Sequence, residues 1–317
     1  MRILFVKTSS LGDVIHHCPA VSDAARRVPG AQIDWVVEDS FAEIAGMHHA
    51  VHRVIPVAVR RWRRAPWRTG NRQEFAAFRK LLAGERYDRI VDTQGLMKSA
   101  LITRLARGAR HGYDRGSARE PFAAGLYAAR HPVSRSLHAV ERNRRLTAAA
   151  LDYTFGGSAC DYGLRAPAGM PVAVAGPYCV LLTMTSRADK LWPDEHWIAL
   201  GKALAARGIA AVLPWGSKTE QARAARIAAA VDGALVAPAL GIGQLGSLVS
   251  QAKAVVGVDT GLTHLGVALG VPAVGIYCAS DPSLTGLYGS PRARNVGGIG
   301  RMPTVAQALA ALNEATG

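Results

Sequence analysis

Residues 254–278 read AVVGVDTGLTHLGVALGVPAVGIYC, and this stretch decides the fold that we predict for the chain. The apolar run Ala254–Val258 is typical of a parallel strand that is buried on both faces. A turn at 259–261 leads into a short helix over 262–269, and a second apolar strand runs over 273–278. A strand, a crossover helix and a second strand in this order predict a parallel sheet of the α/β class.

The turn in this segment consists of Asp259, Thr260 and Gly261. It is expected where a strand ends and a helix begins, so free backbone N–H groups and the positive end of the helix dipole meet there. Such a position favours a phosphate group. His264 follows about one helical turn later, from where we expect it to reach the same ligand.

Strands alternate with helical patterns through both halves of the chain. Further strands are expected at 3–6, 33–37, 53–57, 89–92, 178–182, 210–213 and 234–236, and helices at 18–28, 75–84, 194–207, 219–231, 243–251 and 304–315. The segment 159–177 is rich in Gly and Pro and is expected to be a linker, with the domain boundary near 165–175. We therefore predict two Rossmann-like domains, 1–165 and 166–317, whose strand ends face a shared cleft.

The positive charge of the chain is concentrated in its first half. Residues 1–150 hold 26 Lys and Arg against 13 Asp and Glu, whereas residues 151–317 hold 12 against 10. This field predicts an anionic partner for the first half: a nucleic acid, an acidic membrane surface, or a phosphorylated or carboxylated substrate.

Other features exclude several classes of protein. No apolar run approaches the roughly 18–20 residues of a membrane span, and the first residues are typical of a strand rather than a signal peptide, so we expect a cytoplasmic protein. The four cysteines have no spacing typical of a zinc site or a disulfide framework. The string Gly241–Gly246 matches a dinucleotide fingerprint, but no evident strand precedes it, which disfavours a nicotinamide cofactor.

Three more junctions carry polar residues with two interpretations each. Asp13 is either a helix N-cap, the commoner role, or a general base at the mouth of the cleft. Thr185, Ser186 and Lys190 form either an ordinary polar loop or a pyrophosphate site. Glu220 either stabilises a helix dipole or accepts hydrogen bonds from a ribose.

The densest basic cluster spans residues 60–64 and reads RRWRR. A run of charge is usually a solvated surface. Here tryptophans interleave with the arginines on what we expect to be a long connection after a strand, and such connections are often functional. Arginines beside aromatic rings also suit single-stranded nucleic acid.

These segments occur together in an order that resembles the lipopolysaccharide heptosyltransferases. The residues that carry the resemblance are 7–16 (KTSSLGDVIH), 60–64, 94–99 (QGLMKS), 118–121 (AREP), 190–193 (KLWP), 213–216 (LPWG) and 259–264 (DTGLTH). The resemblance implies a GT-B glycosyltransferase with no cofactor and no catalytic metal. It implies that heptose passes from ADP-heptose, with inversion, to a Kdo sugar on the lipid A precursor at the cytoplasmic face of the inner membrane, where the protein is peripheral.

The resemblance also implies roles for individual residues. Asp13 is expected to be the general base on the Kdo hydroxyl. The donor is expected to contact Thr185, Ser186, Lys190, Glu220, Asp259, Thr260, Gly261 and His264. The Kdo carboxylates and lipid A phosphates are expected to meet Arg60, Arg61, Arg63, Arg64, Lys98 and Arg119. The last helix of GT-B proteins often packs back on the first domain, so the helix at 304–315 is a candidate for that position.

Two alternative functions remain open at this point. One is a GT-B enzyme that uses a different nucleotide sugar. The other is a non-catalytic nucleic-acid-binding protein, suggested by the basic first half; it leaves the 259–261 turn and Lys190 unexplained, so no nucleic acid is expected as a partner.

Overall fold

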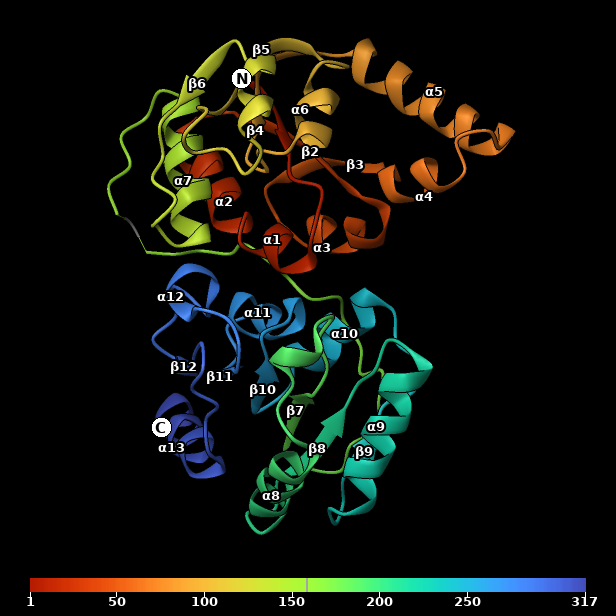
Figure 1. Ribbon diagram of the computed structural model, residues 1–317, viewed down its shortest axis with the longest axis vertical. Coiled ribbons are helices and arrows are strands. Elements are labelled where there is room, and N and C mark those ends of the chain that lie inside the picture. The colour runs from red at the N-terminus through yellow and green to blue at the C-terminus, as the bar shows by residue number, and fades with distance from the viewer. Residues whose placement is uncertain (158) are drawn as a thin grey trace. The chain divides into compact units, whose positions relative to one another are not determined.

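Two six-stranded parallel sheets organise the chain in a computed structural model that describes residues 1–157 and 159–317 (Figure 1). The contacts between residues divide the chain into two compact units, Met1–Gly163 and Leu164–Gly317. Each unit contains one of the sheets. The predicted class, α/β with two Rossmann-like parallel sheets, is confirmed.

The first unit has the strand order β3-β2-β1-β4-β5-β6. Its strands are β1 (Arg2–Val6), β2 (Gln32–Glu38), β3 (Val51–Val57), β4 (Arg86–Asp92), β5 (Arg107–Tyr113) and β6 (Ala129–His131). Its helices are α1 (Leu11–Ile15), α2 (Cys18–Arg27), α3 (Ala42–Gly46), α4 (Val59–Arg64), α5 (Thr69–Gly84), α6 (Met97–Thr103) and α7 (Ala139–Ala150).

The second unit repeats this topology with the order β12-β11-β10-β7-β8-β9. Its strands are β7 (Tyr178–Leu182), β8 (Ala210–Leu213), β9 (Leu235–Val236), β10 (Ala254–Val258), β11 (Ala273–Tyr277) and β12 (Ala293–Gly297). Its helices are α8 (Asp194–Ala205), α9 (Lys218–Ala229), α10 (Ile242–Ser250), α11 (Gly261–Ala268), α12 (Pro282–Thr285) and α13 (Val305–Thr316).

The strand order reverses at one place in each sheet. In the first sheet the chain progresses outward from β1 on one side and from β4 on the other, and in the second from β7 and β10. Crossover connections diverge at such a point, so a crevice opens at the carboxyl ends of the two central strands, where α/β proteins bind ligands. The loops after β1, β4, β7 and β10 are therefore the places to look for a site.

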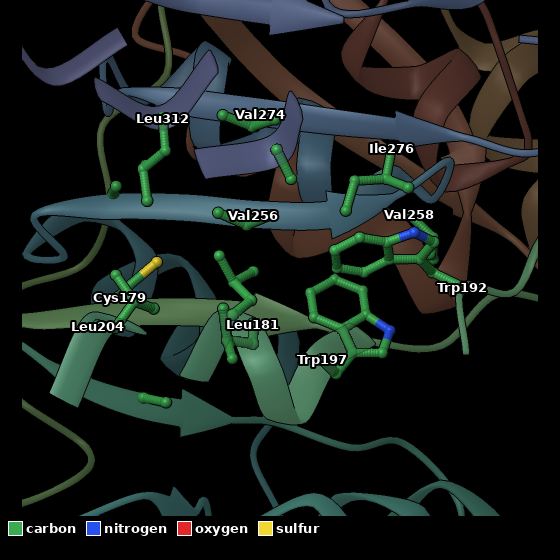
Figure 2. Packing of buried hydrophobic residues seen from close by; sticks show 14 of the residues in the cluster. Cys179, Leu181, Trp192, Trp197, Leu204, Val256, Val258, Val274, Ile276 and Leu312 are labelled. Atoms are coloured by element: carbon green, nitrogen blue, oxygen red, sulfur yellow. The ribbon is translucent and has the colours of Figure 1, made fainter. Parts of the chain in front are cut away.

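A continuous apolar core holds the second sheet against its helices (Figure 2). The indole rings of Trp192 and Trp197 pack edge to face, with centroids 5.0 Å apart, beside strand residues such as Val256 and Ile276. Leu312 of α13 belongs to the same core. Helix α13 therefore packs its apolar face against the sheet of the second unit. The family resemblance had suggested instead that this last helix packs on the first domain.

Two local expectations were wrong. Residues 60–64 do not lie on an irregular connection, because helix α4 spans Val59–Arg64. Asp13 is not an N-cap, because Ser10 occupies that position and Asp13 is the third residue of α1. Among the described residues, no helix is both long enough and apolar enough to cross a membrane.

Candidate active site

The turn after β1 presents the Asp13 carboxylate at the reversal point of the first sheet. Ser10 and Asp13 form a capping box, in which Oδ2 of Asp13 accepts hydrogen bonds from the backbone N (3.1 Å) and Oγ (3.3 Å) of Ser10. These bonds set the orientation of the carboxylate relative to the turn. Asp13 retains 14% side-chain exposure, so a substrate can reach it.

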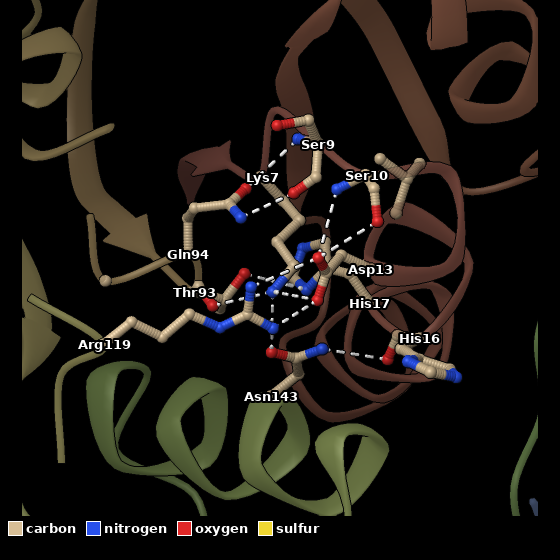
Figure 3. Close-up of polar contacts among 12 residues, drawn as sticks. Lys7, Ser9, Ser10, Asp13, His16, His17, Thr93, Gln94, Arg119 and Asn143 are labelled. Carbon is tan, nitrogen blue, oxygen red and sulfur yellow. Dashed lines mark hydrogen bonds and ion pairs between the residues drawn. The ribbon is translucent and has the colours of Figure 1, made fainter. Parts of the chain in front are cut away.

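Two cations face this carboxylate (Figure 3). Arg119 donates to it with Nη2 at 2.6 Å from Oδ1 and Nη1 at 3.3 Å from Oδ2. The Nζ atom of Lys7 lies 4.0 Å from Oδ1. Burial raises the pKa of Asp13, but the charges of Lys7 and Arg119 outweigh this effect and hold the pKa well below its usual range. Asp13 is therefore ionised at neutral pH.

Lys7 is a buried cation at the end of β1. Its Nζ donates to the carbonyl oxygen of Thr93 (2.9 Å) and to Oδ1 of Asn143 on α7 (3.4 Å). Burial lowers the pKa of Lys7 to about 8, although the charge of Asp13 opposes this shift. Lys7 thus joins β1, the loop after β4 and α7 beneath the Asp13 carboxylate.

The loop after β4 holds the turn after β1 in place. The Gln94 side chain accepts hydrogen bonds from the backbone N atoms of Thr8 (2.9 Å) and Ser9 (3.2 Å), and its Nε2 donates to the Ser9 carbonyl oxygen at 2.5 Å. Lys98, at the start of α6, donates to Oγ of Ser9 at 2.8 Å. Lys98 and Asp13 therefore flank the same short turn.

The arginines of α4 are exposed. Arg61 is held by Asp39 (2.5 Å) and Glu74 (2.8 Å), so its charge is already partnered. The backbone N of Arg60 donates to Oε1 of the buried Glu38 at 3.1 Å, which ties the start of α4 to the end of β2. Arg63 and Arg64 are exposed on the same helix.

A second polar cluster surrounds Asp259 at the reversal point of the second sheet. Its Oδ2 accepts hydrogen bonds from Nζ of Lys190 (2.6 Å) and Oγ of Ser280 (2.7 Å), and its Oδ1 lies 3.9 Å from Nε2 of His264. Burial raises the pKa of Asp259, but the contacts with His264, Lys190 and Ser280 outweigh it, so the pKa lies well below its usual range. Oγ1 of Thr185 donates to the Asp259 carbonyl oxygen at 3.0 Å.

Helix α11 begins directly beside this cluster. Thr260 is its N-cap residue, with extended backbone and no capping hydrogen bond from its side chain. The helix lies close to β10 because Gly257 has no side chain: a Cβ there would stand 2.2 Å from Oγ1 of Thr263. That hydroxyl donates instead to the Val258 carbonyl oxygen at 2.7 Å. The helix start is thus held at the strand end with its first N–H groups directed to the crevice.

The other two predicted donor residues, Ser186 and Glu220, follow strands of the same sheet, but among the described residues neither makes a hydrogen bond to the cluster around Asp259. Ser186 is exposed in the loop after β7. Glu220 follows β8, the neighbour of β7, and its Oε2 accepts a hydrogen bond from the Gly216 backbone N at 2.6 Å. This bond is the helix-start role that the sequence left open, and the Glu220 side chain remains partly exposed.

The structure therefore assembles two sets of predicted residues. Asp13, Arg119 and Lys98 meet around the turn after β1, and Thr185, Lys190, Asp259, Thr260, Gly261 and His264 meet around the start of α11. Sequence reasoning missed the supporting roles of Lys7, Gln94 and Ser280. Lys7 and Gln94 follow the central strands β1 and β4, and Ser280 follows β11, the neighbour of β10; each lies within three residues of the strand end, and that position was the available signal.

Solved structures show which class of protein this arrangement defines. The structure described as E. coli heptosyltransferase WaaC with ADP matches with a TM-score of 0.92 and 41% sequence identity, covering 99% of this chain and all of that one. The same enzyme with ADP-2-deoxy-2-fluoro heptose matches with a TM-score of 0.86 and 42% identity, covering 99% and 98%. The two sheets, together with this likeness to heptosyltransferase structures, define a GT-B glycosyltransferase.

Sequence comparisons narrow this class to a family. The model of glycosyltransferase family 9 (heptosyltransferase) matches residues 75–310. Lipopolysaccharide heptosyltransferase 1 of Pseudomonas aeruginosa is 47% identical over 290 residues, 91% of this chain and 82% of that protein. Its counterpart in Escherichia coli K12 is 46% identical over 292 residues, 91% of each. The chain belongs to glycosyltransferase family 9, the heptosyltransferases, and is an enzyme.

Proposed function

We propose that this enzyme transfers L-glycero-D-manno-heptose from ADP-heptose, with inversion, to Kdo on the lipid A precursor of lipopolysaccharide. The relatives of highest similarity described above are named lipopolysaccharide heptosyltransferase 1, and a similar solved structure contains a fluorinated ADP-heptose. The observation that carries the proposal is the Asp13 carboxylate, ionised and oriented by its capping box at the reversal point of the first sheet.

Asp13 acts in this proposal as the general base that accepts the proton of the attacking Kdo hydroxyl. A carboxylate with a lowered pKa is a weak base, so its proton transfer is late. Such a base suffices when the electrophile already approaches an oxocarbenium ion, because the attacking oxygen becomes acidic only as its bond to carbon forms. Arg119 keeps the carboxylate ionised and, being partly exposed, also attracts an acidic acceptor sugar.

The second cluster acts on the leaving group. Cleavage of the bond between heptose and phosphate places negative charge on the pyrophosphate, and cations and helix N–H groups already in place stabilise it. Lys190 and the start of α11 supply these groups. Asp259 orients Lys190 by accepting a 2.6 Å hydrogen bond from its Nζ. We assign Asp259 and His264 to the sugar end of the donor, Thr185, Ser186, Thr260 and Gly261 to the pyrophosphate, and Glu220 to the ribose.

The basic first unit is assigned to the acceptor, and the second unit to the donor, with the boundary at the 159–177 linker. Arg60, Arg63, Arg64 and Lys98 are proposed to meet the Kdo carboxylates and lipid A phosphates, with Arg61 available after exchange of its acidic partners. The acceptor is lipid-linked, so we place the protein peripherally on the anionic cytoplasmic face of the inner membrane.

The test is turnover, measured as nucleoside diphosphate release, with ADP-heptose, UDP-sugars and GDP-sugars against a deacylated Kdo-lipid A acceptor. We expect turnover with ADP-heptose and loss of about 10²-fold to 10⁴-fold in kcat for Asp13→Asn, the range for removal of a general base. Asp152→Asn is the control, because the side chain of Asp152 is 75% exposed. A preference for another nucleotide sugar would overturn the donor assignment. Near-normal kcat for a folded Asp13→Asn variant would overturn the base assignment.

A further inference from the structure

Residues of the edge strand β3 and of helices α4, α5 and α6 line an apolar groove in the first unit. Figure 1 labels these four elements. The volume of the groove is about 700 Å³, and Val57, Trp62, Phe75, Phe78, Leu101 and Ile102 contribute most of its apolar lining. The Trp62 ring lies against the rings of Phe75 and Phe78, with centroids 5.5 and 5.6 Å away. A volume of this size falls within the range of roughly 300–1,000 Å³ that small-molecule sites have.

The groove is open to solvent through side chains that normally prefer burial. Leu101 is 54% exposed and Phe75 42% exposed. Trp67, which follows α4 in the chain, is 74% exposed. Large apolar residues that gather on one exposed face mark a binding site more often than chance exposure. The basic cluster RRWRR thus has a second property, because its Trp62 and Arg63 line the groove while Arg60, Arg61 and Arg64 are exposed outside it.

The charged side chains that line the groove are all positive, and the nearby Glu74 is held by Trp62 and Arg61. Arg63, Lys98 and Arg104 line it together with the apolar side chains, and no acidic residue is among its described lining residues. Lys98 connects the groove to the turn that carries Asp13, because its Nζ donates to Oγ of Ser9 at 2.8 Å. Three features therefore follow one another: the Asp13 carboxylate, the cations around Lys98, and the apolar lining of the groove. A molecule with a sugar, then an anionic group, then an apolar tail would match them in this order.

We propose that this groove binds a fatty-acyl chain of the lipid-linked acceptor. This inference rests on the proposed function, since it assigns the tail of the molecule whose sugar meets Asp13. The apolar lining of the groove matches the polarity of an acyl chain, and a phosphate of the same lipid complements Arg63, Lys98 and Arg104. The groove then favours acylated over deacylated acceptor through KM, because the tail is bound equally before and during reaction at the distant sugar.

The test compares acylated and deacylated Kdo-lipid A, in the same detergent, for the wild type and two leucine variants. Leu101→Glu places a carboxylate at the groove. Leu81→Glu is the matched control, because Leu81 is an exposed leucine of α5 (42%) that does not line the groove. We expect Leu101→Glu to raise KM for the acylated acceptor by about tenfold or more, as a few lost methylene contacts imply. KM for the deacylated acceptor and all values for Leu81→Glu should stay near wild type.

A direct binding measurement complements the kinetics. A brominated fatty acid should quench the fluorescence of Trp62, and the quenching should disappear in Trp62→Phe and weaken in Leu101→Glu but not in Leu81→Glu. Equal KM effects of Leu101→Glu on both acceptors, or quenching that Trp62→Phe leaves unchanged, would overturn the acyl-chain site.

Two further outcomes separate the possible failures. If the wild type fails to turn over the deacylated acceptor with ADP-heptose, the proposed function fails, and the quenching result still decides whether the groove binds acyl chains. If Leu101→Glu lowers co-sedimentation with acceptor-free phosphatidylglycerol vesicles as strongly as it raises KM, the groove inserts into the bilayer itself, and the assignment to the acceptor is overturned.

Discussion

Nη2 of Arg119 lies 2.6 Å from Oδ1 of Asp13, although the two residues are 106 positions apart in the chain. The contact depends on Gly95, whose φ of +68° lets the loop after β4 pass close to residues 118–119. The Gly95 carbonyl oxygen accepts a hydrogen bond from the backbone N of Glu120 at 3.0 Å, which holds the two loops together. Arg119 thus reaches Asp13 through a loop that is itself anchored.

Replacing Arg119 should change the pH dependence of the reaction. Burial raises the pKa of Asp13 and Arg119 helps to lower it, so Arg119→Met should raise this pKa. A base works only when deprotonated, and the acid limb of the pH profile of kcat/KM should therefore move to higher pH. Arg119→Lys, which keeps a charge, should move the limb less. The same acid limb in Arg119→Met and the wild type would show that Arg119 does not set the charge of Asp13.

Lys7 should give the protein a recognisable dependence of stability on pH. Its pKa is lowered from 10.5 to about 8 in the folded state. Between these values the unfolded chain binds more protons than the folded one, so the contribution of Lys7 to the free energy of unfolding rises with pH, at a slope of up to about 1.4 kcal/mol per pH unit.

This slope is measured against Lys7→Met by urea unfolding at several pH values from 7.5 to 10.5. Groups common to both proteins cancel in the difference between the two free energies of unfolding. The wild type should gain stability relative to the variant over this range. A difference that stays constant with pH would mean that Lys7 is solvated, contrary to its burial.

Lys190 should matter for chemistry more than for folding. Its side chain is 19% exposed, and in the proposed mechanism its ammonium group stabilises the phosphate of the leaving group. Lys190→Met should lower kcat by about 10-fold to 10³-fold, since it removes a cation from the leaving group, and Lys190→Arg should retain part of the rate. Lys202→Met on α8, an exposed lysine, serves as control. If Lys190→Met raised only the KM for the donor, the lysine would bind the ground state and the transition state equally.

Gly257 should tolerate no side chain. A Cβ there would lie 2.2 Å from Oγ1 of Thr263 and 2.9 Å from Cβ of Leu182, so Gly257→Ala must push α11 away from the sheet. We expect a loss of about 1–3 kcal/mol in the free energy of unfolding and weaker donor binding by calorimetry. Gly84→Ala is the control, since a Cβ at Gly84 meets nothing within 4 Å. Equal stabilities of the two variants would contradict this account of the helix–strand contact.

Local patterns predicted the elements next to the site well. The strands 178–182, 210–213 and 254–258 were predicted with the bounds that the structure has, because their apolar runs are short, continuous and ended by polar turns. Strand β5 was missed. Its residues, Arg107–Tyr113, include two glycines and three basic side chains, and they form a strand because β4 and β6 pair with it on either side.

The candidate site was predictable in residue type but not in its contacts. Asp13 and Lys190 stood out because each follows a first strand and precedes a helix. Arg61 stood out because it belongs to a dense run of positive charge. In the structure its charge is paired with Asp39 and Glu74, and no local sequence pattern connects these residues with Arg61. The structure also places Asp13 at the third position of α1 and Ser10 at the N-cap. The sequence could not decide between these two residues, because helix starts are uncertain by a few positions.

The sequence by itself determined the parallel α/β class, the polar turns at the strand ends and the basic first half, because apolar periodicity, turn residues and charge act over a few neighbouring positions. Only the tertiary structure decided which distant side chains surround each carboxylate. The parallel strands β1 and β4 bring Lys7 and Thr93 together, and helix α7 adds Asn143. Burial then lowers the pKa of Lys7, whereas the charges of Lys7 and Arg119 keep Asp13 ionised in spite of its burial. Burial and long-range pairing are properties of the folded chain, so no segment carries them alone.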